Sequence, residues 1–248
     1  AKIMLPPMPG LVWAEGLGLV GVGATAAAAR IAADIGVQTL RVMADGEAAG
    51  GYRPIGEADT FDMEYWSLEQ AKLGRGPRPP LEGRVVLVTG GAGAIGRACA
   101  RAFAAQGASV FLTDRDEAAL GAALRELGRD HGGMAADVTE PGAAAAVAAA
   151  CARRFGGLDI LLSNAGAAWQ GEIATLPEAE LRASFELNFF AHQAMAQAAV
   201  ALFRAQARGR GAPGGAQILF NVSKQAVNPG RGFGAYGLGR SGDAWVLL

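Results

Sequence analysis

Short apolar runs and alanine-rich amphipathic stretches alternate along the second two thirds of the chain. The runs are apolar nearly throughout, which is typical of strands buried on both faces of a parallel sheet. The predicted strands are 84–89, 109–114, 134–138, 158–166 and 216–223, the fourth running on into a loop. The first predicted helix ends at Gln106, and the others span 116–128, 141–155 and 177–207. This order predicts an α/β fold with helices on both faces of one sheet.

A stretch rich in proline and glycine separates this part from a shorter N-terminal one. GRGPRPPLEG (74–83) holds three prolines and three glycines, so it can continue neither a helix nor a central strand. Before it, 11–23 predicts two short strands around a glycine turn, 24–50 a helix and 57–73 a shorter helix. This is too little to close a core. We expect 1–73 to be a small α+β remnant of another domain, 74–83 a linker and 84–248 the main domain.

Composition narrows the class of protein. About half of the 248 residues are apolar (51%), and the formal net charge is −1 with basic and acidic residues interspersed. No basic stripe indicates nucleic acid or an anionic membrane surface as a partner. No apolar run is long enough to span a bilayer, and the N-terminus has no signal-peptide pattern, so we expect a cytoplasmic protein. Cys99 and Cys151 lie in alanine-rich helices and are expected to be reduced thiols.

A glycine-rich loop follows the first strand of the main domain. In TGGAGAIG (89–96), Gly91, Gly93 and Gly96 satisfy the G-x-G-x-x-G spacing at a strand-to-helix junction, where helix N–H groups can bind a pyrophosphate. Asp114 ends the second strand eighteen residues after Gly96. A carboxylate there can accept hydrogen bonds from the adenosine ribose and repel a 2′-phosphate, which favours NAD over NADP. Arg115 weakens that choice, since a guanidinium can hold a 2′-phosphate.

The same glycine spacing occurs a second time near the N-terminus. Gly16, Gly18 and Gly21 alternate with leucine and valine, and no second strand with a terminal acid follows. This copy predicts a glycine-rich hairpin and not a nucleotide site.

Polar residues come at the ends of the later strands. Asp137 ends the third, Asn164-Ala165-Gly166 the fourth and Ser223 the fifth, while Asn188 lies inside the long helix and Tyr236 follows Ser223 by thirteen positions. In this order and spacing, together with TGGAGAIG and Asp114, they resemble the short-chain dehydrogenase/reductase family over roughly 80–248. The resemblance implies a Rossmann-type doubly wound parallel sheet. The cofactor-binding residues it implies are Gly90, Gly91, Gly93, Ala94, Ile95, Gly96, Asp114, Arg115, Asp137, Val138, Asn164, Ala165 and Gly166.

The resemblance also implies catalytic roles. Tyr236 would be the general acid/base for hydride transfer between nicotinamide and a carbonyl carbon, Ser223 would bind the same substrate oxygen, and Asn188 would help to hold a water. A phenol has a pKa of about 10, so it is a poor base at neutral pH unless a nearby cation favours phenolate. The family has lysine four residues after the tyrosine, and this chain has Arg240. Arginine keeps the charge but is wider and cannot lose its proton, so we expect cofactor binding with weakened turnover. The chain holds nineteen arginines and three lysines, so compositional drift is a second explanation for Arg240.

A closer resemblance is to bifunctional proteins that join a class II aldolase to a short-chain dehydrogenase. It rests on FDMEYWSLEQAKL (61–73), the linker, and SKQAVNPG (223–230). It implies that 1–73 ends an aldolase-like domain, and that the substrate is a small hydroxy compound or aldehyde from sugar breakdown. Class II aldolases bind zinc through histidines. His131 and His192 both lie in the dehydrogenase part without metal-site spacing, so we interpret them as surface or helix-packing residues and expect neither a metal site nor lyase activity.

The family has further strands after the tyrosine helix, so we expect the sheet to be truncated after its fifth strand and the chain to be a piece of a longer protein. An alternative function is therefore a non-catalytic dinucleotide-binding module or inactive fragment of an aldolase/dehydrogenase fusion. Relatives form oligomers through the helix at 177–207, which makes a homo-oligomer a further expectation.

Overall fold

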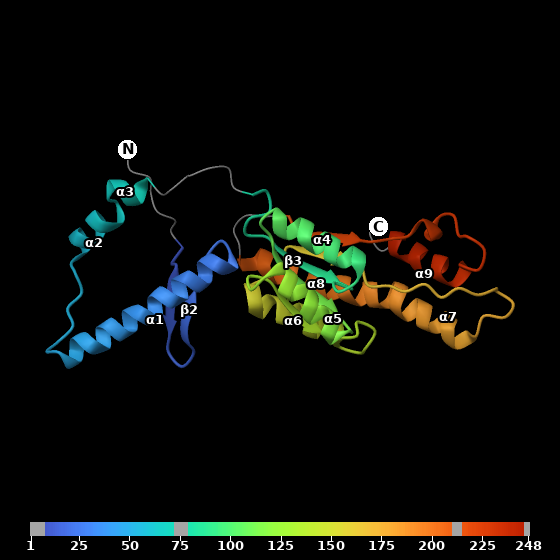
Figure 1. Ribbon diagram of the computed structural model, residues 1–248, viewed down its shortest axis with the longest axis horizontal. Helices are drawn as coiled ribbons and strands as arrows, with labels where there is room; N and C mark the ends of the chain where they lie inside the picture. The colour runs from blue at the N-terminus through green and yellow to red at the C-terminus, as the bar shows by residue number, and fades with distance from the viewer. Residues whose placement is uncertain (1–7, 72–78, 210–214, 246–248) are drawn as a thin grey trace. The chain divides into compact units, whose positions relative to one another are not determined.

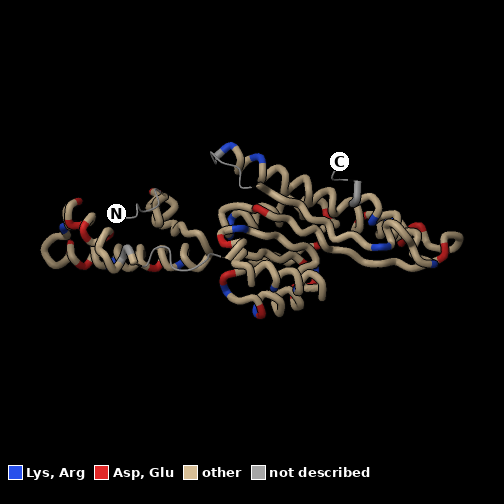
Figure 2. Tube along the Cα trace, turned by 90° about the horizontal axis from the view of Figure 1, so that it is seen from above, with Lys and Arg blue, Asp and Glu red and all other residues tan. Residues whose placement is uncertain are grey.

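The computed structural model describes residues 8–71, 79–209 and 215–245 and divides the chain into two compact units, Ala1–Pro80 and Leu81–Leu248 (Figure 1). Residues 74–78 of the predicted linker lie outside the described residues. In Figure 2, acidic and basic residues are interspersed within each unit. Among the helices of the described ranges, none has both the length and the apolar composition that crossing a membrane requires.

The first unit is built on an antiparallel hairpin. Strands β1 (Leu11–Ala14) and β2 (Gly18–Gly21) pair in the register Leu11 to Gly21, which confirms the predicted hairpin. Helix α1 (Ala26–Ala48) begins at Thr25, whose hydroxyl accepts a hydrogen bond from the Ala28 N–H at 3.1 Å. It packs on the hairpin through the buried Gly36, where a side chain would collide with leucines of both strands. The predicted helix at 57–73 is two helices in the described residues, α2 (Glu57–Glu64) and α3 (Ser67–Gln70).

The second unit is a five-stranded parallel sheet in the order β5-β4-β3-β6-β7. The strands are β3 (Val85–Thr89), β4 (Ser109–Asp114), β5 (Gly132–Ala135), β6 (Ile160–Ser163) and β7 (Gln217–Phe220). The chain starts in the middle strand, moves outward to β5, returns past β3 to β6, and moves outward again. This reversal between β3 and β6 is the point at which open α/β sheets bind ligands, at the carboxyl ends of the strands.

Helices cover both faces of this sheet (Figure 1). The helices are α4 (Ala94–Ala105), α5 (Glu117–Leu127), α6 (Ala143–Phe155), α7 (Glu178–Phe185), the π-helix Glu186–Phe190, α8 (Ala191–Gly209), the 3₁₀ turn Lys224–Ala226 and α9 (Gly234–Trp245). Val85 and Leu87 of β3 pack with α6 and α8, whereas Val86 and Val88 pack with α4 and α5. Alternate residues of one strand thus enter two separate cores, which confirms the doubly wound fold.

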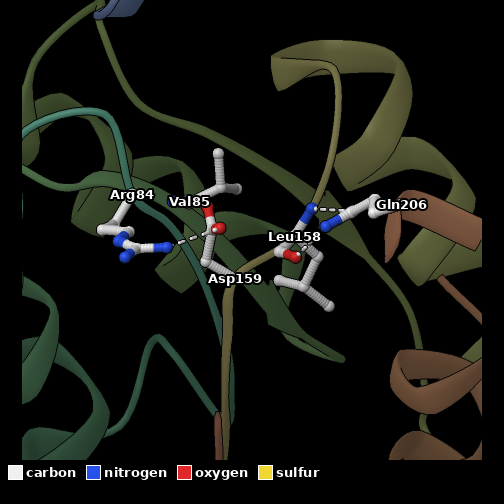
Figure 3. A network of polar contacts seen from close by, with 5 residues as sticks. All are labelled: Arg84, Val85, Leu158, Asp159 and Gln206. Atoms are coloured by element: carbon white, nitrogen blue, oxygen red, sulfur yellow. Dashed lines mark hydrogen bonds and ion pairs between the residues drawn. The ribbon is translucent and has the colours of Figure 1, made fainter. Parts of the chain in front are cut away.

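A polar network fixes the end of the sheet opposite the carboxyl ends of its strands (Figure 3). The buried Asp159, just before β6, accepts hydrogen bonds from the Val85 N–H at 2.9 Å and from Arg84 at 3.2 Å. Gln206 of α8 donates to the Leu158 carbonyl at 2.8 Å and accepts from the Leu158 N–H at 2.7 Å. These contacts set the register of the two central strands where the chain enters them.

Three predicted elements are wrong in detail. The strand expected at 134–138 is Gly132–Ala135, so Asp137 lies beyond its end, and the strand expected at 216–223 stops at Phe220. The helix expected over 177–207 is interrupted by a π-helix around Asn188. Such an insertion commonly marks a functional position, and here the interruption coincides with a side chain bonded outside the helix, as described below.

Candidate active site

A cavity of about 780 Å³ lies at the carboxyl ends of the strands of the second unit. It is lined by the glycine loop, the ends of β4, β5 and β6, the start of the π-helix, the segment after β7 and α9. The residues are Gly90, Gly93, Ala94, Ile95, Gly96, Thr113, Asp114, Arg115, Ala136, Asp137, Val138, Thr139, Asn164, Ala165, Gly166, Ala167, Trp169, Ala183, Glu186, Leu187, Asn221, Val222, Ser223, Tyr236 and Arg240. All predicted site residues line it except Gly91 and Asn188.

The glycine loop needs glycine at several positions because backbone approaches it closely. Gly90 has φ +63°, and a Cβ on it would come within 2.9 Å of the Ala165 backbone. A Cβ on Gly96 would overlap the Gly90 carbonyl, so the helix can start this close to the loop only with glycine there. Gly93 precedes α4 without a side-chain cap, so the helix N-terminus presents free N–H groups to the cavity. Gly91 lies under the loop, packed on Leu112, with its N–H donating to the Thr113 carbonyl at 3.0 Å.

Asp114 both shapes this loop and lines the cavity. One carboxylate oxygen accepts from the Ala92 N–H at 3.0 Å, and the other accepts from the Asp116 N–H at 3.2 Å. Each oxygen keeps a further lone pair. The carboxylate therefore fixes the glycine loop and can still accept hydrogen bonds from a ligand hydroxyl.

Asp137 lies on the next strand end, past β5. Hydrogen bonds from the Thr139 hydroxyl and N–H, and the charge of Arg115, hold the pKa of Asp137 below its ordinary value. Arg115 is thus close enough to Asp137 for its charge to matter. A guanidinium with a carboxylate neighbour is partly neutralised as a binder of a 2′-phosphate.

The segment after β6 is tied to the end of β3. The buried Thr89 hydroxyl accepts from the N–H groups of Asn164 at 2.8 Å and Ala165 at 2.9 Å. The Asn164 amide donates to the Thr89 carbonyl at 2.9 Å and accepts from the Asn221 amide at 2.7 Å. Asn164 therefore joins β3, β6 and the segment after β7 at the point where the strand order reverses.

Asn188 is fully buried and holds the loop that follows Gly166. Its amide oxygen accepts from the Ala167 N–H at 3.2 Å, and its amide nitrogen donates to the Ala167 carbonyl at 2.8 Å. The side chain thus binds backbone and does not line the cavity. The predicted role in holding a water stays a prediction.

Ser223, Tyr236 and Arg240 lie on the segment that closes the cavity. Ser223 begins the 3₁₀ turn, and its hydroxyl accepts from the Gln225 N–H at 3.3 Å. Helix α9 packs closely on the π-helix because it carries glycines at the contacts: a Cβ on Gly239 would lie 3.2 Å from that of Asn188, and one on Gly242 would collide with Phe189. This close packing brings Tyr236 to the cavity wall and takes Arg240 into the interior.

Arg240 as a residue is 3% exposed and lies one helical turn from Tyr236, with the central carbon of its guanidinium 5.5 Å from the centroid of the Tyr236 ring. It donates to the Ala165 carbonyl at 3.3 Å and lies 2.9 Å from Nε2 of His192. A Cβ on Gly166 would overlap it. The guanidinium therefore packs against the Ala165–Gly166 backbone in the cavity wall.

Of the two interpretations of His192, as a surface or as a helix-packing residue, the structure agrees with helix packing, since His192 is buried on α8. Its side chain is buried, with Nδ1 2.9 Å from the Ser163 hydroxyl and Nε2 2.8 Å from the Ala165 carbonyl. Burial, and secondarily the charge of Arg240, lowers the pKa of His192 to about 4 against an opposing hydrogen bond with Ala165. The imidazole is therefore neutral at physiological pH. His131 is different: its Nδ1 accepts from the Val110 N–H at 3.1 Å, away from the cavity.

Sequence reasoning missed His192 and the cavity-lining Trp169. His192 follows Asn188 by four residues, which places both on one side of a helix. That spacing was a usable signal. Trp169 lies in an irregular loop, where no periodicity points to it. Within the described ranges, no group of three or more histidine, cysteine, aspartate or glutamate side chains could hold a metal ion.

The family follows from comparison with known proteins. A family model for the short-chain dehydrogenases matches residues 84–242. The chain belongs to the short-chain dehydrogenase family. Residues 1–73 match a model for the second domain of class II aldolases, so both parts of the expected resemblance are confirmed. The first matched segment ends at residue 73 and the second begins at residue 84, so the two flank the predicted linker.

Relatives place this short-chain dehydrogenase among oxidoreductases. It is 27% identical over 234 residues to the uncharacterized oxidoreductase YuxG of Bacillus subtilis (strain 168), covering 92% of this chain and 33% of YuxG. It is 32% identical to galactitol 2-dehydrogenase of Agrobacterium fabrum, covering 68% of this chain and 58% of the relative. A solved protein of Sinorhizobium meliloti 1021, assigned to the short-chain alcohol dehydrogenases, superposes with a TM-score of 0.62 at 32% identity, covering 68% of this chain and 66% of that one. The chain thus spans only a third of YuxG.

Proposed function

We propose that this chain is an NAD-dependent oxidoreductase acting on a small hydroxy compound or aldehyde from sugar breakdown. The observation that carries the proposal is the shared cavity. The glycine loop and Asp114 line the same 780 Å³ space as Ser223 and Tyr236. The residues proposed to bind the nucleotide and those proposed to transfer the proton therefore line one cavity.

The residues present fit a dinucleotide. The free N–H groups at the start of α4 suit a pyrophosphate, and the loop glycines leave no room for side chains where it would lie. Asp114 supports NAD over NADP because its carboxylate repels a 2′-phosphate. Arg115 supports NADP less than the sequence indicated, because the nearby Asp137 carboxylate partly neutralises the guanidinium charge that would bind a 2′-phosphate. When bound, the nicotinamide would supply hydride acceptance or donation.

The protein residues would handle the proton. We assign Tyr236 as the general acid/base at the substrate oxygen, and Ser223 as the hydroxyl that hydrogen-bonds the same oxygen. The Arg240 guanidinium lies over the Tyr236 ring, where a cation is attracted to the aromatic face. Asn188 would act indirectly, by fixing the loop at Ala167.

The substrate class rests on weaker support. Galactitol 2-dehydrogenase is named for a polyol, and the match of 1–73 to an aldolase domain points to sugar chemistry. We extend both to this chain as a proposal: a polyol or a short hydroxy compound, oxidised at a secondary or primary alcohol.

A second candidate function is a non-catalytic dinucleotide-binding module. It is favoured by Arg240, because the guanidinium is engaged by Ala165 and His192 in the cavity wall and stands where the family has lysine. Both candidates predict cofactor binding, and they differ in turnover.

The test is NADH formation by the purified full chain with NAD and a panel of polyols and short hydroxy compounds. The proposal predicts turnover with at least one of them, lowered by about 10²- to 10⁴-fold in Tyr236→Phe without loss of NADH binding. Tyr52→Phe, in the first unit, is the matched control and should leave turnover unchanged. Equal turnover in Tyr236→Phe would overturn the assignment of Tyr236. Binding without turnover on the whole panel would favour the second candidate.

A further inference from the structure

The Arg240 guanidinium is joined to three separate parts of the second unit. It belongs to helix α9, and it contacts the Ala165 carbonyl after β6 and the imidazole of His192 at the start of α8. The nitrogen of Arg240 nearest His192 is 2.9 Å from Nε2, a hydrogen-bond distance within the buried interior. Arg240 is thus held by partners that come from far apart in the sequence.

The tautomer of His192 follows from this contact. A guanidinium nitrogen can only donate, because arginine keeps its proton. Nε2 must then accept, which leaves the ring proton on Nδ1, where it can be donated to the Ser163 hydroxyl 2.9 Å away. The opposite tautomer would donate from Nε2 to the Ala165 carbonyl, but it would set two donors against each other at Arg240. The first tautomer sets two acceptors, Nε2 and the Ala165 carbonyl, 2.8 Å apart, and the guanidinium offsets this because its two terminal nitrogens donate one to each. A charge-assisted hydrogen bond in a buried site is stronger than a neutral one, so the first tautomer is favoured.

We propose that His192 is a positioning residue for Arg240: its Nε2 accepts a hydrogen bond from the guanidinium and holds it against Ala165–Gly166 in the cavity wall, so that it does not extend into the cavity. The part of this proposal that concerns cofactor binding in the cavity rests on the proposed function. Without the acceptor, a long cationic side chain in the cavity wall would turn toward the cavity, where water can solvate it. The arginine is therefore compatible with a bound dinucleotide only together with His192.

The proposal differs from a role in packing alone. A packing residue would affect the chain equally whatever occupies position 240. A positioning residue matters only while arginine is there, because a lysine ammonium is a compact charge without a planar head to hold aside.

The first experiment is a double-mutant cycle read by NADH titration of the full chain. His192→Leu should weaken NADH binding about tenfold, the scale of one lost charge-assisted hydrogen bond, in the Arg240 chain, and less than about twofold in the Arg240→Lys chain. His192→Gln, whose amide oxygen can accept from Arg240, should restore most of the affinity. Met195→Leu is the matched control, since Met195 is equally buried on α8 and contacts the apolar core. An equal loss in both backgrounds, or no loss in either, would overturn the proposal.

The second experiment needs neither cofactor nor turnover. The chain has only two histidines, so ¹⁵N-histidine spectra assigned with His131→Gln report His192 directly. Nε2 should be unprotonated in the unchanged chain and protonated in Arg240→Met, where it is released to donate to Ala165. The same tautomer in both would overturn the proposal. If the unchanged chain binds no NADH, the proposed function fails, and this spectrum alone then decides on His192.

Discussion

The two ends of the cavity are built in different ways. At the glycine-loop end the working groups are backbone N–H groups and one strand-end carboxylate, all within 89–114. At the Tyr236 end they are the side chains of Ser223, Tyr236 and Arg240, and Arg240 is held by His192 of α8 and by Ala165 after β6, which lie 48 and 75 positions away in the sequence. The first end depends on the local course of the chain. The second depends on the packing of three elements that only the complete fold brings into contact.

The largest effect is expected at the glycine-loop end. Gly96→Ala places a methyl group on the Gly90 carbonyl, so loop and helix must separate and the pyrophosphate site is lost. NADH binding by calorimetry should become undetectable. Gly121→Ala is the control, because in α5 an added Cβ meets only the flexible end of Arg125 at 3.5 Å. Retained binding in Gly96→Ala would mean that the close approach at Gly96 is not what forms the site.

A pH-dependent loss of stability is expected from the other end. The pKa of His192 is about 4 in the folded chain against an ordinary value of 6.5, so the unfolded state takes up more protons between these values. The contribution of the neutral His192 imidazole to the free energy of unfolding is fully present above pH 6.5. It is lost as the pH drops toward 4, by roughly 3 kcal/mol in all. Urea unfolding across this range should show the loss in the unchanged chain and a shallower slope in His192→Gln. The pKa of His131 is also lowered by burial, so His131→Gln measures its share. An unchanged slope in His192→Gln would contradict the buried neutral imidazole.

Thr89 lies between the two ends and should show an intermediate effect. Thr89→Val keeps the shape but leaves the N–H groups of Asn164 and Ala165 without their acceptor, at a cost of about 1–3 kcal/mol in the free energy of unfolding. Thr89→Ser keeps the hydroxyl and should recover most of this stability. If both variants unfold at the same urea concentration, the hydroxyl does not hold the segment after β6.

The smallest effect concerns cofactor choice. Asp114→Ala should lower the preference for NADH over NADPH by about tenfold, since a repelling carboxylate near the 2′-phosphate is removed. Glu117→Ala removes an exposed carboxylate three residues away that does not line the cavity, and should leave the ratio unchanged. The ratio is the informative quantity, because Asp114 also binds the Ala92 N–H and its loss can weaken both cofactors.

The same contrast explains what the sequence could predict. The five strands, the helices on both faces of the sheet and the glycine loop follow from short-range patterns of apolar residues and glycine, the doubly wound arrangement was implied by the family resemblance, and the structure confirms them. The π-helix was missed because it coincides with the bonds of the Asn188 side chain to the Ala167 backbone, a contact between segments that local propensity does not show. The burial of Arg240 was missed because it depends on glycines that let α9 approach the π-helix, a tertiary effect with no local periodicity, whereas the spacing from Asn188 to His192 was a signal that the sequence did offer.

The most direct test of the central claim is titration of the folded full chain with NADH, followed by nicotinamide fluorescence excited through Trp169, which lines the cavity. The account predicts saturable enhancement that is lost in Gly96→Ala and whose energy-transfer component is reduced in Trp169→Phe. A chain that is folded by circular dichroism and shows no saturable NADH binding would contradict it.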